Sequence, residues 1–210
     1  MYNCQICQDA GFVYAVCADG SVNYGNVVPC LCSRDSIEQA RQRKLLEWCE
    51  LPPASEGMRF DTFRVQPHLQ EAYGAALDVV SGELKWLTLT GRTNQGKTHL
   101  AVAICHEWLG SGKSARYAYV PLLLDELRRG FDKGDNYDRR FEMFLNVPLL
   151  VLDDLGTENS TPWVQEKLDT IVDYRLMHEL ALVVTANLSL SQLSPRIASR
   201  LMRHGQVVAV

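Results

Sequence analysis

The stretch Gly91-Arg92-Thr93-Asn94-Gln95-Gly96-Lys97-Thr98 decides the fold of this chain. It fits the pattern G-x-x-x-x-G-K-[ST], in which backbone N–H groups of a loop surround nucleotide phosphates. The apolar residues 84–90 before it indicate a buried strand, and residues 98–109 after it indicate a helix. The positive end of that helix would face the phosphates, so the sequence predicts a nucleotide-binding loop between a strand and a helix.

All eight residues of this loop are expected to contact the nucleotide. Lys97 would reach the β- and γ-phosphates, and Thr98 would ligate Mg²⁺. Asn94 and Gln95 stand where such loops often carry a further glycine. Because asparagine tolerates positive φ better than other non-glycine residues, we expect the loop to form. The alternative is a glycine-rich turn with an incidental lysine.

Helical and strand-like segments alternate from residue 69 onward. Continuous apolar strands are expected at 115–120, 148–154 and 181–186, with helices at 69–80, 121–129, 137–146, 162–179 and 195–204 and a last short strand at 206–210. Gly130 is expected to end the helix at 121–129. Strands that are apolar throughout, alternating with helices, predict an α/β fold with a parallel sheet flanked by helices.

Polar side chains stand where two of these strands end. Asp153 and Asp154 close one strand, and Asn187 follows another. Ligands of parallel sheets bind at the carboxyl ends of the strands, so these residues should converge with the loop on one site. Asp153 would hold Mg²⁺, Asp154 would orient or deprotonate the attacking water, and Asn187 would contact that water or the γ-phosphate. Solvated polar groups at strand ends are the alternative.

Four of the seven cysteines come in two close pairs, Cys4-x-x-Cys7 and Cys30-x-Cys32. Two β-type runs around Asp19-Gly20 lie between the pairs and predict a hairpin. Two cysteine pairs that bracket a hairpin suit a structural zinc site with four thiolates, as in a zinc ribbon. Fortuitously paired free cysteines are the alternative, and Cys17 in the hairpin is expected to be a bystander unless it replaces one of the four.

Composition and charge narrow the classes of function. The formal net charge of −4 over 210 residues provides no bulk attraction to nucleic acid, so any such contact needs a local patch. No apolar run is long enough to span a membrane, and the N-terminus lacks the pattern of a signal peptide. We therefore expect a cytoplasmic protein that has no membrane partner.

The expected domain organisation has three parts. Residues 1–50 would form the zinc-binding module and a basic helix, 51–66 a linker, and 67–210 the nucleotide-binding core. Phe60 and Phe63 are expected to dock the linker on the core. Near the end of the chain, Arg196 and Arg200 share one face of a short helix, where one of them could reach the γ-phosphate of a neighbouring subunit. Solvated arginines are the alternative.

Several segments together resemble the DnaC/DnaI-like helicase loaders, a branch of the AAA+ ATPases. They are Gly-Lys-Thr-His-Leu-Ala at 96–101, Leu-Leu-Val-Leu-Asp-Asp-Leu-Gly at 149–156, Thr-Ala-Asn-Leu-Ser at 185–189 and Arg-Ile-Ala-Ser-Arg-Leu at 196–201. The cysteine segment is similar to the zinc module that precedes some members. These segments follow the family's order and span most of the chain.

The resemblance implies an ATP-dependent partner of the hexameric replicative DNA helicase that places the helicase on single-stranded DNA. It implies that the N-terminal module grips the helicase, that Asn187 is a sensor and that Arg200 is the arginine finger. It weakly implies DNA contacts for Arg128, Arg129 and Lys133. ATP-dependent self-assembly follows from the finger. Few residues follow Arg200, so a reduced C-terminal lid is expected, and the short Asp154 side chain suggests slow hydrolysis.

Two other functions remain open at this point. The first is a helper ATPase for DNA transposition of the IstB type, which shares the core motifs. The second is an adaptor that binds ATP without hydrolysing it, so that the nucleotide only sets a conformation. The zinc module favours the loader over the transposition helper, and the acid pair favours hydrolysis over simple binding.

Overall fold

The computed structural model describes residues 2–133, 137–157, 161–187 and 189–210. The chain divides into two compact units, Met1–Lys44 and Leu45–Val210. Residues 51–66, which the sequence predicts as a linker, lie in the second unit. None of the helices in the described parts of the chain has the length and apolar character needed to span a membrane.

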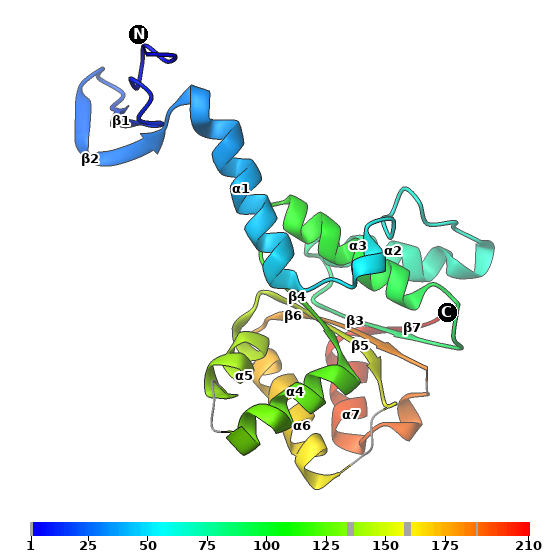
Figure 1. The fold of residues 1–210 in the computed structure, drawn as a ribbon. Coiled ribbons are helices and arrows are strands. Elements are labelled where there is room, and N and C mark those ends of the chain that lie inside the picture. Colours follow the sequence, from blue (N-terminus) through cyan, green and yellow to red (C-terminus); the bar gives the residue numbers. More distant parts are fainter. Residues whose placement is uncertain (1, 134–136, 158–160, 188) are drawn as a thin grey trace. The chain divides into compact units, whose positions relative to one another are not determined.

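The first unit is built on an antiparallel hairpin, drawn in blue in Figure 1. β1 (Phe12–Val16) pairs with β2 (Val22–Pro29), and the register shifts between Tyr14 and Ala15. The Asp19 carboxylate closes the turn by accepting hydrogen bonds from the backbone N–H and the hydroxyl of Ser21, at 3.0 and 2.7 Å. The hairpin predicted around Asp19-Gly20 is confirmed. α1 (Leu31–Cys49) follows, and its residues up to Lys44 belong to this unit.

Five parallel strands form the sheet of the second unit (Figure 1). Their order is β4-β5-β6-β3-β7, and every neighbouring pair is parallel. Their bounds are β3 (Trp86–Thr90), β4 (Ala115–Tyr119), β5 (Leu149–Leu155), β6 (Ala181–Ala186) and β7 (Gln206–Ala209). The predicted α/β fold with a parallel sheet is confirmed.

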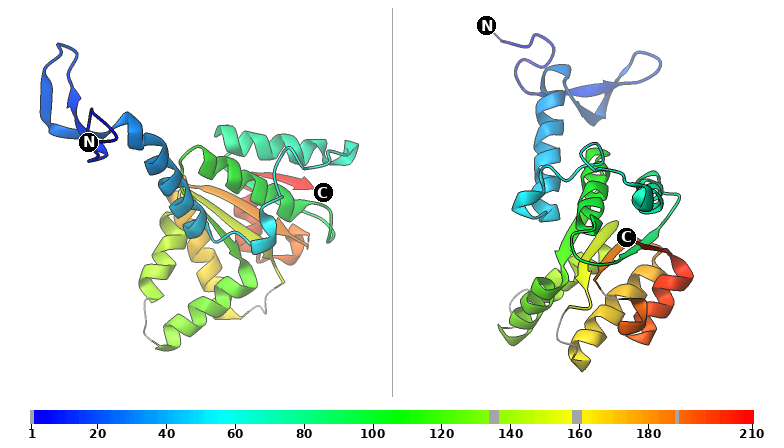
Figure 2. Two further views of the ribbon diagram at one scale, coloured as in Figure 1. Left: turned by 45° about the horizontal axis from the view of Figure 1, so that its top comes forward. Right: turned by 90° about the vertical axis from the view of Figure 1, so that its right-hand side faces the viewer.

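Helices cover both faces of this sheet, as the views in Figure 2 show. α2 (Gln70–Ser81) and α3 (Lys97–Gly110) pack on one face in a cluster with strand residues such as Leu87 and Val183. The other face packs in a second cluster with residues such as Leu150 and Val184. Its helices are α4 (Val120–Lys133), α5 (Tyr137–Asn146), α6 (Pro162–Met177) and α7 (Pro195–His204). Strands buried on both sides explain the uninterrupted apolar runs in the sequence.

Two helix ends differ from the prediction. α4 runs through Gly130 to Lys133, so the expected stop at Gly130 is wrong. A glycine ends a helix by adopting positive φ, and Gly130 is not among the glycines that do so. α6 ends at Met177, two residues before the predicted end, because Glu179 turns to a φ of 52°. Short 3-10 turns at Pro53–Ser55, Pro67–Leu69 and Leu190–Gln192 were not predicted.

Arg175 on α6 is fully buried and holds several chain segments together. Its guanidinium donates hydrogen bonds, 2.5–3.2 Å long, to the carbonyl oxygens of Phe144, Leu145, Val147, Pro148 and Ala181. These carbonyls lie at the end of α5, in the turn into β5 and at the start of β6. Burial lowers the pKa of Arg175 to about 9, so the side chain remains charged at neutral pH.

Candidate functional site

The predicted nucleotide loop follows β3, and its last two residues, Lys97 and Thr98, are the first two residues of α3. Asn94 has a φ of 62° and Gly96 a φ of 93°, so asparagine takes the left-handed conformation expected of it. A Cβ atom at Gly96 would lie 2.8 Å from Cε2 of Phe63, and one at Gly91 would lie 2.2 Å from the carbonyl oxygen of Val210. The glycines are thus required for both conformation and space.

Lys97, the invariant lysine of this loop motif, folds back onto the loop. Its Nζ donates to the carbonyl oxygens of Gly91 and Arg92 at 2.9 and 2.7 Å. Burial lowers the pKa of Lys97, whereas the nearby carboxylates of Asp154 and Asp153 raise it. The ammonium group is therefore held at the loop by neutral acceptors that an anion could replace.

Asp153 is a buried carboxylate surrounded by hydroxyl donors. Thr185 donates to Oδ1 and Tyr117 donates to Oδ2, each at 2.6 Å. Thr98 lies 3.1 and 3.2 Å from the two oxygens. Burial raises the pKa of Tyr117, so its hydroxyl keeps the proton that it donates. Thr98 and Asp153, predicted to hold Mg²⁺ together, are thus in direct contact.

Asp154 projects from the end of β5 in a strained conformation, with a φ of 65°. Its backbone N–H donates to Thr185 Oγ1 at 2.9 Å, which fixes the turn. The Asn187 amide donates to its carboxylate, and the hydroxyls of Tyr119 and Thr157 lie 3.4 Å from Oδ2. With this backbone conformation, Asp154 lines the same cavity as loop residues 93–98.

A cavity of about 400 Å³ brings most of the predicted site residues together. Four strand ends supply its polar lining, because the loop follows β3, Tyr119 ends β4, the acids lie near the end of β5 and Asn187 follows β6. The lining comprises Met58, Thr93, Asn94, Gln95, Gly96, Lys97, Thr98, His99, Tyr119, Asp153, Asp154, Thr185 and Asn187. Of the residues predicted for the nucleotide site, three are outside this lining, namely Gly91, Arg92 and Arg200.

The sequence analysis did not identify several residues that line this cavity or contact its lining. Tyr117 and Tyr119 alternate along β4, a pattern that places both on one face and could have linked them to the acids. His99 is one residue past the loop motif; its Nε2 lies 2.8 Å from the carbonyl oxygen of Arg59, and its ring packs edge-on against Phe63 at 5.0 Å. Phe60 and Phe63 pack against the core cluster, as predicted, but no sequence signal connects Arg59 with the loop.

The arginines of α7 are placed against α6. Arg196 pairs with Asp173 at 2.5 Å and with Asp169 at 3.9 Å, and Arg200 pairs with Asp173. The predicted finger is therefore engaged within its own chain. Of the residues expected to contact DNA, Arg128 lies over the Trp163 ring at 5.6 Å, and the side chain of Lys133 is outside the described residues.

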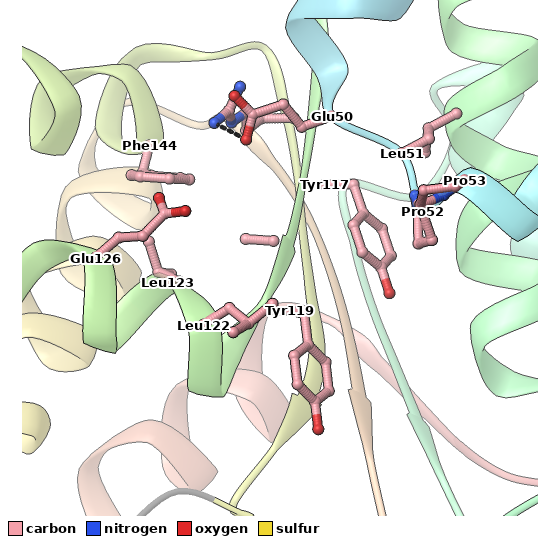
Figure 3. A pocket seen from close by; sticks show the side chains of 12 residues that line it. Glu50, Leu51, Pro52, Pro53, Tyr117, Tyr119, Leu122, Leu123, Glu126 and Phe144 are labelled. Atoms are coloured by element: carbon pink, nitrogen blue, oxygen red, sulfur yellow. Dashed lines mark ion pairs between the residues drawn. The ribbon is translucent and has the colours of Figure 1, made fainter.

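A second, more apolar cavity of about 450 Å³ lies beside β4 (Figure 3). Its walls come from the segment 50–53, from β4 and from α4 and α5, and Glu50 forms a 2.5 Å ion pair with Arg116 in it. Tyr119 lines this groove and also the nucleotide cavity. The two cavities therefore adjoin at one tyrosine ring.

The four paired cysteines of the first unit form one cluster. Their sulfur atoms all lie within 4.8 Å of one another, with 3.8 Å between Cys4 and Cys30 and 3.5 Å between Cys7 and Cys32. A tetrahedral Zn²⁺ with Zn–S bonds of about 2.3 Å would set its sulfurs about 3.8 Å apart. The cluster therefore has the donor set and spacing to hold a metal ion. Cys17 is not part of this cluster and lies exposed in the hairpin.

Comparisons with known proteins agree with this geometry. The replicative helicase loader DnaI of Bacillus subtilis is 30% identical over 114 residues, which cover 54% of this chain and 36% of that protein. The replicative helicase loader DnaC of Escherichia coli K12 is 26% identical over 155 residues, covering 71% and 63%. The chain thus spans about a third to two thirds of the length of these relatives.

The solved structures include a crystal structure of the DnaC helicase loader with a TM-score of 0.69. It is 25% identical to this chain and aligns with 76% of this chain and 99% of that one. The AAA+ type of core predicted from the sequence is therefore confirmed. The model of the IstB-like ATP binding proteins matches residues 14–205, nearly the whole chain. This chain accordingly belongs to the family of IstB-like ATP binding proteins.

Proposed function

We propose that this protein is an ATPase that loads a replicative DNA helicase onto single-stranded DNA, with ATP binding and slow hydrolysis acting as a switch. The observation that carries this proposal is the cavity in which the loop at 93–98, Asp153, Asp154 and Asn187 meet. The similarity to the DnaI and DnaC loaders supports the helicase as the partner. An acidic pair beside a phosphate-binding loop supports hydrolysis rather than binding alone.

The loop N–H groups from Thr93 to Gly96 would bind the phosphates, and Lys97 would leave the carbonyls of Gly91 and Arg92 for the β- and γ-phosphates. The hydroxyl of Thr98 and the carboxylate of Asp153 would hold Mg²⁺, which neutralises phosphate charge when it is bound. These groups neutralise and position the substrate.

Asp154 is the proposed acceptor of the water proton. The Asn187 amide that donates to it would keep the carboxylate oriented toward the γ-phosphate, where both groups can contact one water. Arg200 would complete the site of a neighbouring copy after ATP-dependent self-assembly. Hydrolysis is expected to be slow because the aspartate side chain is short.

The first unit is the proposed grip on the helicase, with structural Zn²⁺ held by Cys4, Cys7, Cys30 and Cys32. In this proposal, residues 1–50 form the gripping module, 51–66 a linker and 67–210 the ATPase core. The proposed place of action is the cytoplasm, at single-stranded DNA opened for replication.

Co-purification with the replicative helicase tests the choice of partner. A tagged chain should retain the helicase, and the Cys7→Ser, Cys30→Ser double variant should lose it while still binding ATP. Failure to retain the helicase with ATP, ADP or no nucleotide present would exclude the loader function.

Two substitutions test the chemistry. Lys97→Ala should abolish ATP binding, whereas Asp154→Asn should retain binding and lose hydrolysis by about 10²-fold or more, because the water loses its proton acceptor. Wild-type hydrolysis by Asp154→Asn would contradict the role assigned to that carboxylate. Absence of hydrolysis in the wild-type protein together with intact helicase binding would favour the non-hydrolysing adaptor.

The second candidate is a helper ATPase for DNA transposition, favoured by the match to the IstB-like family over residues 14–205. The cluster of four cysteines favours the loader, because it adds a separate unit for a partner. Retention of a transposase in place of the helicase in the same co-purification would decide for the helper.

A further inference from the structure

A cluster of four charged side chains joins α6 to α7. Asp173 accepts a hydrogen bond from Arg196 Nη2 at 2.5 Å and also pairs with Arg200. Arg196 Nε lies 3.9 Å from Asp169. The Asp173 and Arg200 side chains are only 23% and 25% exposed, whereas that of Arg196 is 58% exposed. Asp173 is thus the centre of the cluster and binds both arginines.

This cluster contains Arg200, the arginine that is proposed to act in the site of a neighbouring copy. Asp173 pairs with Arg200 Nε, and Arg200 Nη1 donates to the backbone carbonyl of Arg196 at 3.4 Å, so both contacts hold the side chain against its own chain and would have to be given up for it to reach a phosphate on another copy. Arg200 is also outside the described lining of the cavity in its own chain. Asp173 and a γ-phosphate are therefore competing anions for one cation.

The two arginines differ in what their departure would leave behind. Arg196 is shared between Asp173 and Asp169, so it stays near Asp173 if Arg200 leaves. The partly buried carboxylate then keeps a cation, and the large penalty of an unpaired buried charge is avoided. Loss of Arg196 would remove the partner that Asp173 shares with Asp169. Departure of Arg200 therefore leaves both aspartates beside Arg196, whereas departure of Arg196 would take from Asp169 the arginine that lies 3.9 Å from it.

We propose that Asp173 is a positioning residue that holds Arg200 in the separate chain and releases it to the ATP of a neighbouring copy on assembly. This inference rests on the proposed role of Arg200. An ion pair whose side chains keep about a quarter of their surface in solvent is screened, and we expect it to change an equilibrium by about two- to fivefold, whereas an arginine finger changes turnover by about 10³- to 10⁵-fold. The phosphate of a bound neighbour is thus the stronger competitor, and the pair restrains self-assembly without preventing it.

The test measures ATP turnover per chain as a function of protein concentration. Asp173→Asn removes the charge but preserves the shape, so its half-maximal concentration should fall about two- to fivefold with an unchanged plateau. Asp169→Asn is the matched control, because it lies 3.9 Å from Arg196 and is not paired with Arg200, and its curve should follow the wild type. A purely structural role of Asp173 would instead lower the plateau or the melting temperature.

Arg200→Ala distinguishes the finger role of Arg200 from its restraint by Asp173. It should lose the plateau, and Asp173→Asn should have no further effect in its background. If Arg200→Ala keeps the wild-type plateau, the finger role is wrong and the restraint falls with it. If Arg200→Ala is deficient but Asp173→Asn shifts nothing, only the restraint is wrong. If no variant hydrolyses ATP, sedimentation with a non-hydrolysable ATP analogue decides, because Asp173→Asn should still assemble at lower concentration.

Discussion

The two units of this chain are stabilised by different means. In the described part of the first unit, the only buried apolar side chains are those of Cys7 and Cys30, while Tyr24 on the hairpin is 75% exposed. The second unit buries one apolar cluster on each face of its sheet. A segment as short as the first unit cannot bury enough surface to fold by itself, so a metal ion held by the four cysteines would supply the missing free energy.

Metal removal should produce the largest difference in stability between the two units. A chelator is expected to unfold the hairpin, because a structural zinc site contributes about 10–16 kcal/mol to such modules. All four tryptophans, at positions 48, 86, 108 and 163, belong to the second unit, so their fluorescence should stay native while the hairpin amide signals collapse in NMR spectra. Cys17→Ser is the control and should keep its metal. A hairpin that stays folded after chelation would show that the first unit does not depend on metal for its stability.

Arg175→Met should have the next largest effect, in the second unit only. Several buried carbonyls lose their donor, so the free energy of unfolding should fall by about 3 kcal/mol. Urea titrations followed by tryptophan fluorescence measure this change, and zinc content should remain at the wild-type value. Arg175→Lys keeps a cation but not the planar fork, and should recover only part of the loss. An unchanged urea midpoint would show that these hydrogen bonds contribute nothing net.

Nucleotide should also stabilise the second unit alone. At about 100 times its dissociation constant, Mg-ATP should add about 2.7 kcal/mol to the free energy of unfolding of the core. Lys97→Ala should remove this gain, since Lys97 is the cation of the loop. Differential scanning calorimetry would resolve the two transitions, and a shift of the zinc-dependent transition by ATP would mean that the units are energetically coupled.

The smallest effect is expected at the tyrosines of β4. Tyr117→Phe removes a 2.6 Å hydrogen bond to a buried carboxylate and should cost about 1.5 kcal/mol. Tyr119→Phe is the matched control, because its hydroxyl lies 3.4 Å from Asp154 and should contribute less than about 0.5 kcal/mol. Equal losses in urea titrations would show that burial does not separate these two contacts.

Local patterns in the sequence were sufficient to predict much of this molecule. The loop, the apolar strands and the hairpin each follow from a short-range signal, and the convergence of Asp153, Asp154 and Asn187 follows from the geometry of parallel sheets. The clustering of the cysteine pairs likewise follows from their spacing around a hairpin.

Long-range contacts could not be predicted in the same way. The Tyr117 bond to Asp153 and the Asp173 pair with Arg200 join residues whose proximity depends on strand order and helix packing. Nothing in the local sequence gives that order. At Gly130 the local signal was misleading. Glycine has a strong tendency to end helices, but Gly130 remains inside α4, whose residues Leu124 and Leu127 are buried in the core.

Thr185 has a consequence for which sequences this site can tolerate. Its single hydroxyl proton goes to Asp153, so only its lone pairs are left to receive the N–H of Asp154. Valine has the same shape but can neither donate to Asp153 nor accept from the Asp154 backbone. One hydroxyl at position 185 thus holds the side chain of one acid and the backbone of the other, so this site needs threonine or serine there.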